Sequence, residues 1–212
     1  MSVIQESLSL YTTGTLFIWS GFASPGLLKE ALVINSALSV VYFDFPYPKD
    51  YALFIKTAKK PFIFLGFSMG GFEALSLAQT LSHEESLSAL YLICVCDHYT
   101  PEALDGLEKR LRTDFQEGLK KFYRSCFLEM RTYKLFFKKF SSTFLAQSPA
   151  VLNASLSYLR QCQLKGLDKV HAPVYIMNAE SDQIASSFSF NSLAKNCHLE
   201  LMPGGHMDWI FS

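Results

Sequence analysis

One short stretch constrains the fold of this chain more than any other: an apolar run that ends in a glycine-flanked serine. Phe62-Ile-Phe-Leu65 is followed by Gly66-Phe-Ser68-Met-Gly70-Gly71, and a helical pattern runs over Met69–Leu81. A sharp turn from a strand into a helix strains the backbone of the serine, and only small residues fit two before and two after it. We therefore predict that Ser68 projects above a sheet at a helix N-terminus, where backbone N–H groups favour a developing anion. The alternative is a glycine-rich turn with an incidental serine.

Further apolar runs of strand length recur along the chain, and helical patterns separate them. The runs are Leu16–Trp19, Leu38–Phe43, Phe62–Leu65, Ala89–Val95, Pro173–Met177 and Cys197–Met202. Strands that are apolar throughout are buried on both faces, which is typical of a parallel sheet covered by helices. Additional helical patterns lie at Lys49–Lys59 and Ser186–Lys195. The alternation predicts an α/β fold with a mostly parallel central sheet flanked by helices.

Residues 101–165 interrupt this alternation, because they contain helical patterns and no convincing strand. The expected helices are Glu102–Phe115, Gln116–Met130, Tyr133–Phe144 and Pro149–Cys162. We predict that this segment is a helical lid, inserted after the fourth strand into a core made of residues 1–100 and 166–212. The alternative is that these helices flank the sheet in the ordinary way.

Composition excludes several classes of protein. Half of the residues are hydrophobic, and 19 basic residues balance 19 acidic ones, so disorder and a strongly basic nucleic-acid binder are both disfavoured. The sequence shows neither a signal peptide at its start nor an apolar run long enough to cross a membrane. The five cysteines are scattered, without metal-ligand spacing, and we expect them to be reduced in a cytoplasmic protein. We expect no metal, no organic cofactor, no nucleic-acid partner and no membrane insertion.

A nucleophilic serine needs a base, and His206 is the best candidate. It follows the last predicted strand, in Pro203-Gly-Gly-His206, where two glycines let the loop carry the imidazole towards Ser68. His98, after the fourth strand, is the main rival. The acid that orients the imidazole is predicted to be Asp182, on the loop after the fifth strand, with Asp97 as the alternative. The order Ser68, Asp182, His206 is a known order for a catalytic triad.

Two backbone N–H groups are needed to hold the oxyanion of an attacked carbonyl. Met69, directly after the candidate nucleophile, is expected to supply one. The loop after the first strand, Trp19-Ser-Gly-Phe-Ala23, is expected to supply the other through the Phe22 amide, because Gly21 permits a tight turn.

With these residues in place, the sequence resembles the α/β-hydrolase superfamily over nearly its whole length. Within that superfamily it is similar to the pimeloyl-ACP methyl ester carboxylesterases of biotin synthesis. The elbow Gly66–Gly71 and the stretch Ser20–Phe22 match motifs of that family, although Ser20 stands where the family has histidine. The closest likeness lies at the start of the predicted lid, in Pro101–Gly106 and Asp114–Gln116 with Leu111 and Phe122.

The resemblance implies hydrolysis of the methyl ester of a pimeloyl chain on acyl carrier protein, through an acyl-enzyme on Ser68. It also implies that the lid docks the carrier protein, which is acidic. Basic side chains cluster in the predicted lid and fit such a role: Lys120, Lys121, Arg124, Arg131, Lys134, Lys138 and Lys139. The alternative for these residues is an ordinary solvated helix face.

Phenylalanines of the same segment are candidates for an acyl-binding tunnel, together with Phe22. We single out Phe127, Phe136 and Phe140; the alternative is that they form the packed underside of the helices. For the whole chain, the alternatives are a general short-chain carboxylesterase or thioesterase on the same fold and, less favoured, a catalytically silent binding module.

Overall fold

The computed structural model describes residues 3–81, 86–185 and 195–211, and its centre is a six-stranded sheet in which every neighbouring pair is parallel. The strand order is β2-β1-β3-β4-β5-β6. The bounds are β1 Thr15–Trp19, β2 Ser39–Phe43, β3 Phe62–Phe67, β4 Leu87–Ile93, β5 Val174–Ala179 and β6 Cys197–Met202. All the predicted runs form strands, so the predicted α/β class and parallel sheet are confirmed.

The central strands are buried because their side chains are apolar on both faces. Every residue of β1 and β3 is buried, and the two strands pair from Thr15 with Phe62 to Trp19 with Gly66. The outermost strands are less buried, and Leu201 on β6 is half exposed. The carboxyl ends of β1 and β3 therefore meet at one edge of the sheet, next to Ser68.

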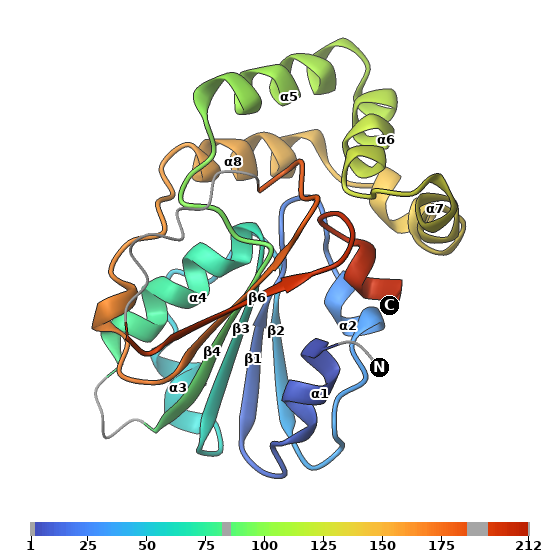
Figure 1. Ribbon diagram of the computed structural model, residues 1–212. Coiled ribbons are helices and arrows are strands. Elements are labelled where there is room, and N and C mark those ends of the chain that lie inside the picture. The colour runs from blue at the N-terminus through green and yellow to red at the C-terminus, as the bar shows by residue number, and fades with distance from the viewer. Residues whose placement is uncertain (1–2, 82–85, 186–194, 212) are drawn as a thin grey trace.

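Helices cover both faces of this sheet (Figure 1). Helices α3 (Ala52–Thr57) and α4 (Met69–Thr80) lie on one face, and α1 (Val3–Ser9) and α2 (Leu27–Ala31) on the other. Helices α3 and α4 were expected. Helices α1 and α2 were not expected. Helix α2 is only five residues long and follows a turn-rich loop. The helix expected at Ser186–Lys195 lies outside the described residues, apart from Lys195.

Four helices occupy the long interval between β4 and β5, and they gather over the carboxyl end of the sheet (Figure 1). They are α5 Pro101–Thr113, α6 Phe115–Ser125, α7 Met130–Leu145 and α8 Pro149–Leu159. The Thr100 hydroxyl caps α5 by accepting from the Ala103 amide, and Asp114 caps α6 by accepting from the Glu117 amide. These caps set the helix starts one residue earlier than the apolar periodicity alone indicates.

An aromatic cluster holds these helices together. Phe136, Phe140 and Phe144 recur every four residues on α7, and each is at most 3% exposed. Tyr123 of α6 packs against Phe136 and Phe144, with ring centroids 5.5 and 5.2 Å away. Within the described ranges, no helix is both long and apolar enough to span a membrane.

Candidate active site

Ser68 lies at a sharp turn between β3 and α4, as predicted. Its backbone has φ 51° and ψ −118°, outside the region that residues with a side chain favour. Two hydrogen bonds hold this conformation: the Ser68 amide donates to the Ile93 carbonyl at 2.8 Å, and the Gly71 amide donates to the Ser68 carbonyl at 2.9 Å. The side chain is 3% exposed. The serine therefore stands at the N-terminus of α4 in a strained and well-supported turn.

The glycines on either side are required by close backbone approach. A Cβ on Gly66 would lie 2.5 Å from the Gly71 Cα and 2.6 Å from the Gly70 carbonyl oxygen. A Cβ on Gly70 would lie 2.4 Å from the Trp19 carbonyl oxygen. Since backbone atoms cannot rotate away as side chains can, both positions exclude any larger residue without movement of the turn.

A chain of hydrogen bonds joins Ser68, His206 and Asp182. The His206 Nε2 lies 3.0 Å from Ser68 Oγ, and Nδ1 lies 2.7 Å from an Asp182 carboxylate oxygen. His206 is 1% exposed, and the Asp182 side chain is 5% exposed. Because Nδ1 faces a carboxylate it carries the proton, so Nε2 is the acceptor that faces the serine hydroxyl. The structure thus brings together the three side chains that the sequence singled out.

Asp182 is held as a carboxylate. Burial by itself raises its pKa, but the attraction of His206 and hydrogen bonds from His206 and from two amides outweigh burial, and the pKa falls below its ordinary value. The amides are those of Ile184 and Ala185, and each donates to Oδ1 at 2.8 Å. The other oxygen, Oδ2, lies 2.7 Å from His206 Nδ1.

The loop that carries His206 is fixed from several sides. Asp208 accepts hydrogen bonds from the Gly205 amide at 2.7 Å and from the Leu128 amide at 2.8 Å. The Trp209 indole donates to the His206 carbonyl at 3.1 Å. The Phe67 ring lies 5.2 Å from the imidazole. Asp208 is also the first residue of the last 3-10 helix, Asp208–Phe211.

The alternatives lie outside this chain of hydrogen bonds. His98 is exposed and Asp97 is half-buried, and both lie on the segment between β4 and α5.

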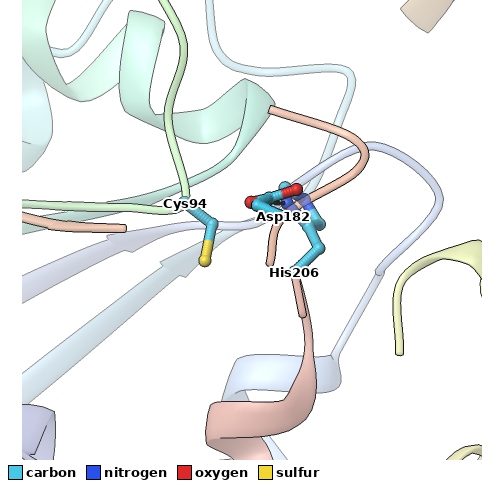
Figure 2. A group of neighbouring side chains, drawn as sticks. All are labelled: Cys94, Asp182 and His206. Carbon is cyan, nitrogen blue, oxygen red and sulfur yellow. Dashed lines mark hydrogen bonds and ion pairs between the residues drawn. The ribbon is translucent and has the colours of Figure 1, made fainter. Parts of the chain in front are cut away.

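Cys94 lies beside Asp182 and His206, and these three side chains have the spacing of possible metal ligands (Figure 2). One ligand atom from each of these residues lies within 4.8 Å of the others. Burial raises the pKa of the Cys94 thiol well above its ordinary value, which disfavours the thiolate that a metal needs. Asp182 and His206 already bind one another. This group therefore fits a metal ion poorly.

The two amides expected to hold an oxyanion are both uncommitted. Within the part of the chain that the structure describes, neither the Phe22 nor the Met69 amide donates a hydrogen bond to a protein oxygen. The loop that presents Phe22 is anchored through its neighbour Ala23, whose carbonyl accepts from the Tyr123 hydroxyl at 2.6 Å and from the Gln147 amide at 2.9 Å. Residues between β4 and β5 therefore position the loop.

A pocket of about 290 Å³ opens onto Ser68. Its apolar walls come from the loop after β1, from α5, α6 and α8, and from the loop after β5; they include Phe22, Leu104, Leu107, Phe122, Leu159 and Ile184. Glu102 and Arg110 add one carboxylate and one guanidinium. Tyr99 also lines the pocket, and its hydroxyl lies 3.1 Å from Ser68 Oγ. Sequence reasoning missed Tyr99, because a tyrosine on a loop carries no signal of its own.

Of the residues predicted to line an acyl-binding tunnel, Phe22 lines this pocket. Phe127, Phe136 and Phe140 do not line it. They pack against one another, with the rings of Phe136 4.9 Å from Phe127 and 5.4 Å from Phe140. Burial inside the helical layer explains this, since rings that are 0 to 3% exposed have no free face left for a substrate. These three residues match the packed-underside alternative, and Phe122 lines the pocket instead.

The predicted basic cluster divides into two groups. Lys121, Arg131, Lys134, Lys138 and Lys139 are exposed on α6 and α7. The Arg124 guanidinium instead makes contacts within the protein: it donates to the Phe127 carbonyl at 2.7 Å and lies over the Tyr133 ring. Lys120 is half-buried and lies 3.9 Å from the Glu117 carboxylate.

No protein-family model matches the chain, and no curated sequence does. Solved structures match over most of its length. An esterase from Exiguobacterium antarcticum has a TM-score of 0.63 at 20% identity, covering 92% of this chain and 86% of its own. BioG from Haemophilus influenzae has a TM-score of 0.67 at 16% identity, covering 92% and 90%. MGS-M2, an alpha/beta hydrolase from a deep-sea metagenome, has a TM-score of 0.63 at 14% identity, covering 92% and 83%. The chain has the α/β-hydrolase fold.

Proposed function

We propose that this chain is a serine esterase in which Ser68, His206 and Asp182 act as the catalytic triad. The observation that carries the proposal is the buried hydrogen-bonded chain from Asp182 through His206 to Ser68, with distances of 2.7 and 3.0 Å. A pocket adjoins the serine, and two uncommitted amides flank it. These are the parts that acyl transfer requires: a nucleophile, an oriented base and an oxyanion site.

The reaction proceeds in two steps. As Ser68 Oγ attacks the ester carbonyl, His206 Nε2 takes its proton, and the Phe22 and Met69 amides hold the oxyanion. His206 then protonates the departing alcohol, which leaves an acyl-enzyme on Ser68. Water activated by His206 releases the acid, and Asp182 stabilises the imidazolium in both steps.

Replacing the nucleophile tests the esterase proposal. Ser68→Ala should lower kcat for a p-nitrophenyl ester by at least about 10⁴-fold, because it removes the atom that forms the acyl-enzyme. Ser155→Ala is the matched control: Ser155 is 2% exposed, and its hydroxyl donates to the Val151 carbonyl of its own helix. A Ser68→Ala protein that is folded and as active as wild type rules out the proposal.

For the substrate, we propose the methyl ester of a pimeloyl chain on acyl carrier protein. The family-like stretches Pro101–Gly106 and Asp114–Gln116, at the start of the predicted lid, support this choice. The apolar pocket walls also support it, because they suit a methylene chain. The exposed cations support the acidic carrier. Arg131, Lys134 and Lys138 are spaced by three and four residues, so they share one face of α7.

Charge reversal on α7 tests whether the enzyme recognises a carrier-bound substrate as well as hydrolysing a small ester. The Lys134→Glu/Lys138→Glu variant should lower kcat/KM for pimeloyl-ACP methyl ester at least about tenfold at low salt, because steering of an acidic partner depends on these charges. It should leave p-nitrophenyl butyrate turnover unchanged. Lys56→Glu on α3, away from this face, is the control. If the wild-type protein cleaves only the small ester, the proposed carrier-bound substrate is wrong. A general carboxylesterase is then the remaining alternative.

A further inference from the structure

Tyr99 is placed against the candidate nucleophile by the junction between β4 and α5. It directly precedes Thr100, the residue that caps α5. Its ring meets Phe72 on the first turns of α4 edge to face, with centroids 6.2 Å apart. Its hydroxyl lies 3.1 Å from Ser68 Oγ, and the residue lines the pocket. The aromatic contact therefore fixes the ring, and the hydroxyl has a defined position.

The proton positions follow from the neighbours of Ser68 Oγ. The His206 imidazole has its proton on Nδ1, facing Asp182, so Nε2 accepts the one hydroxyl proton of Ser68. Ser68 then has only lone pairs to offer Tyr99, and Tyr99 must be the donor. Burial, and next the neighbouring Cys96 thiol, raise the pKa of the Tyr99 hydroxyl well above its ordinary value, so Tyr99 keeps its proton.

We propose that Tyr99 is a further catalytic residue, which donates a hydrogen bond to Ser68 Oγ and stabilises this oxygen as it leaves during breakdown of the acyl-enzyme. This inference rests on the proposed esterase function. In that step, water has already added to the acyl carbon and His206 Nε2 carries the proton of that water. The bond from carbon to Oγ breaks, its electron pair goes to Oγ, and Nε2 delivers the proton to Oγ. Tyr99 transfers no proton of its own.

The two halves of the reaction depend on this contact unequally. Free Ser68 already accepts the hydrogen bond before acylation, so the gain on reaching the transition state is small. In the acyl-enzyme, Oγ is an ester oxygen and a weak acceptor, and it acquires charge only as the carbon–oxygen bond breaks. Hydrogen bonds to charged groups are stronger than those to neutral ones. Loss of the Tyr99 hydroxyl should therefore slow deacylation more than acylation.

Tyr99→Phe tests the inference, because it removes the hydroxyl and keeps the ring on Phe72. With p-nitrophenyl acetate, the burst gives the acylation rate constant, and the decay of acylated protein in mass spectrometry gives the deacylation rate constant. We expect deacylation to fall by about ten- to a hundredfold and acylation to fall less. Tyr11→Phe is the matched control, since the Tyr11 hydroxyl bonds to that of Tyr91, 3.2 Å away, and lies outside the pocket.

Each outcome decides a separate point. If Tyr99→Phe deacylates at the wild-type rate, or if both steps slow equally, the proposed role of Tyr99 is overturned. A purely structural tyrosine predicts the first of these results, because phenylalanine preserves the packing. Labelling of Ser68 by a fluorophosphonate, located by peptide mass spectrometry, tests the esterase proposal by itself. Failure to label wild type refutes that proposal, whereas labelling together with unchanged Tyr99→Phe kinetics refutes only Tyr99.

Discussion

Gly66→Ala is the sharpest test of why the elbow folds as it does. The added methyl group would lie 2.5, 2.6 and 2.8 Å from the Gly71 Cα, the Gly70 carbonyl oxygen and the Gly71 amide nitrogen, whereas ordinary contacts begin at 3.4 Å. All three atoms are backbone, so either β3 or the first turn of α4 must shift by several tenths of an ångström. Overpacking of this kind costs about 3 kcal/mol. A displacement of about 1 Å at the nucleophile can also lower kcat by about 100-fold.

Urea unfolding followed by circular dichroism measures the first effect. With a urea m-value of about 2 kcal/mol/M, a loss of about 3 kcal/mol lowers the midpoint by about 1.5 M. Gly106→Ala provides the same chemical change in the interior of α5, where the nearest atom to the new methyl is Arg110 Nη1 at 3.9 Å. That variant should gain about 0.8 kcal/mol from helix propensity. If Gly66→Ala is as stable as wild type, close backbone approach does not explain the glycine.

Three other substitutions or treatments probe separate features. Asp182→Asn should lower kcat by about 10⁴-fold in steady-state ester hydrolysis, because the wrong imidazole tautomer then faces Ser68. Since the pKa of Asp182 is lowered by folding, its contribution to stability is complete above the ordinary 3.8 and is lost as pH falls through the folded value. Urea midpoints in that acid range should therefore fall more for wild type than for Asp182→Asn. Phe136→Ala should destabilise the fold by about 4 kcal/mol in urea, because the ring is fully buried. Ellman's reagent should reach at most Cys162 and Cys197 in the native protein, as the other cysteines are at most 1% exposed, and burial raises the pKa of Cys162 to about 11.

The sheet could be predicted from the sequence because its strands carry their own signal. A run such as Phe62–Leu65 is apolar on both faces, and only a buried parallel strand suits that pattern in a chain that alternates with helices. Helix α2 carries no comparable signal. Its five residues are too short for a periodicity, and its position depends on Leu27 and Leu28 being buried against the sheet.

The positions of Ser68, Asp182 and His206 were predictable for a related reason. Each follows a strand that the sequence identifies, and parallel strands bring their carboxyl ends to one edge of the sheet. The pocket walls were not predictable in this way. The spacing of Phe136 and Phe140 predicts that one face of α7 is buried, but spacing does not say whether a substrate or another helix covers that face.

The contacts of the loop after β1 show that the helices between β4 and β5 also position this loop. The Ala23 carbonyl accepts from Tyr123 on α6 and from Gln147 just before α8, and Tyr123 is itself packed against the α7 aromatics. The Phe22 amide, one residue away, therefore depends on the helical layer for its position. The Phe22 ring lies 5.2 Å from Phe122 of α6, edge to face, within the same pocket. A shift of α6 that moved Tyr123 would displace the proposed oxyanion donor and a pocket wall together, so the proposed mechanism couples substrate binding to the geometry that stabilises the transition state.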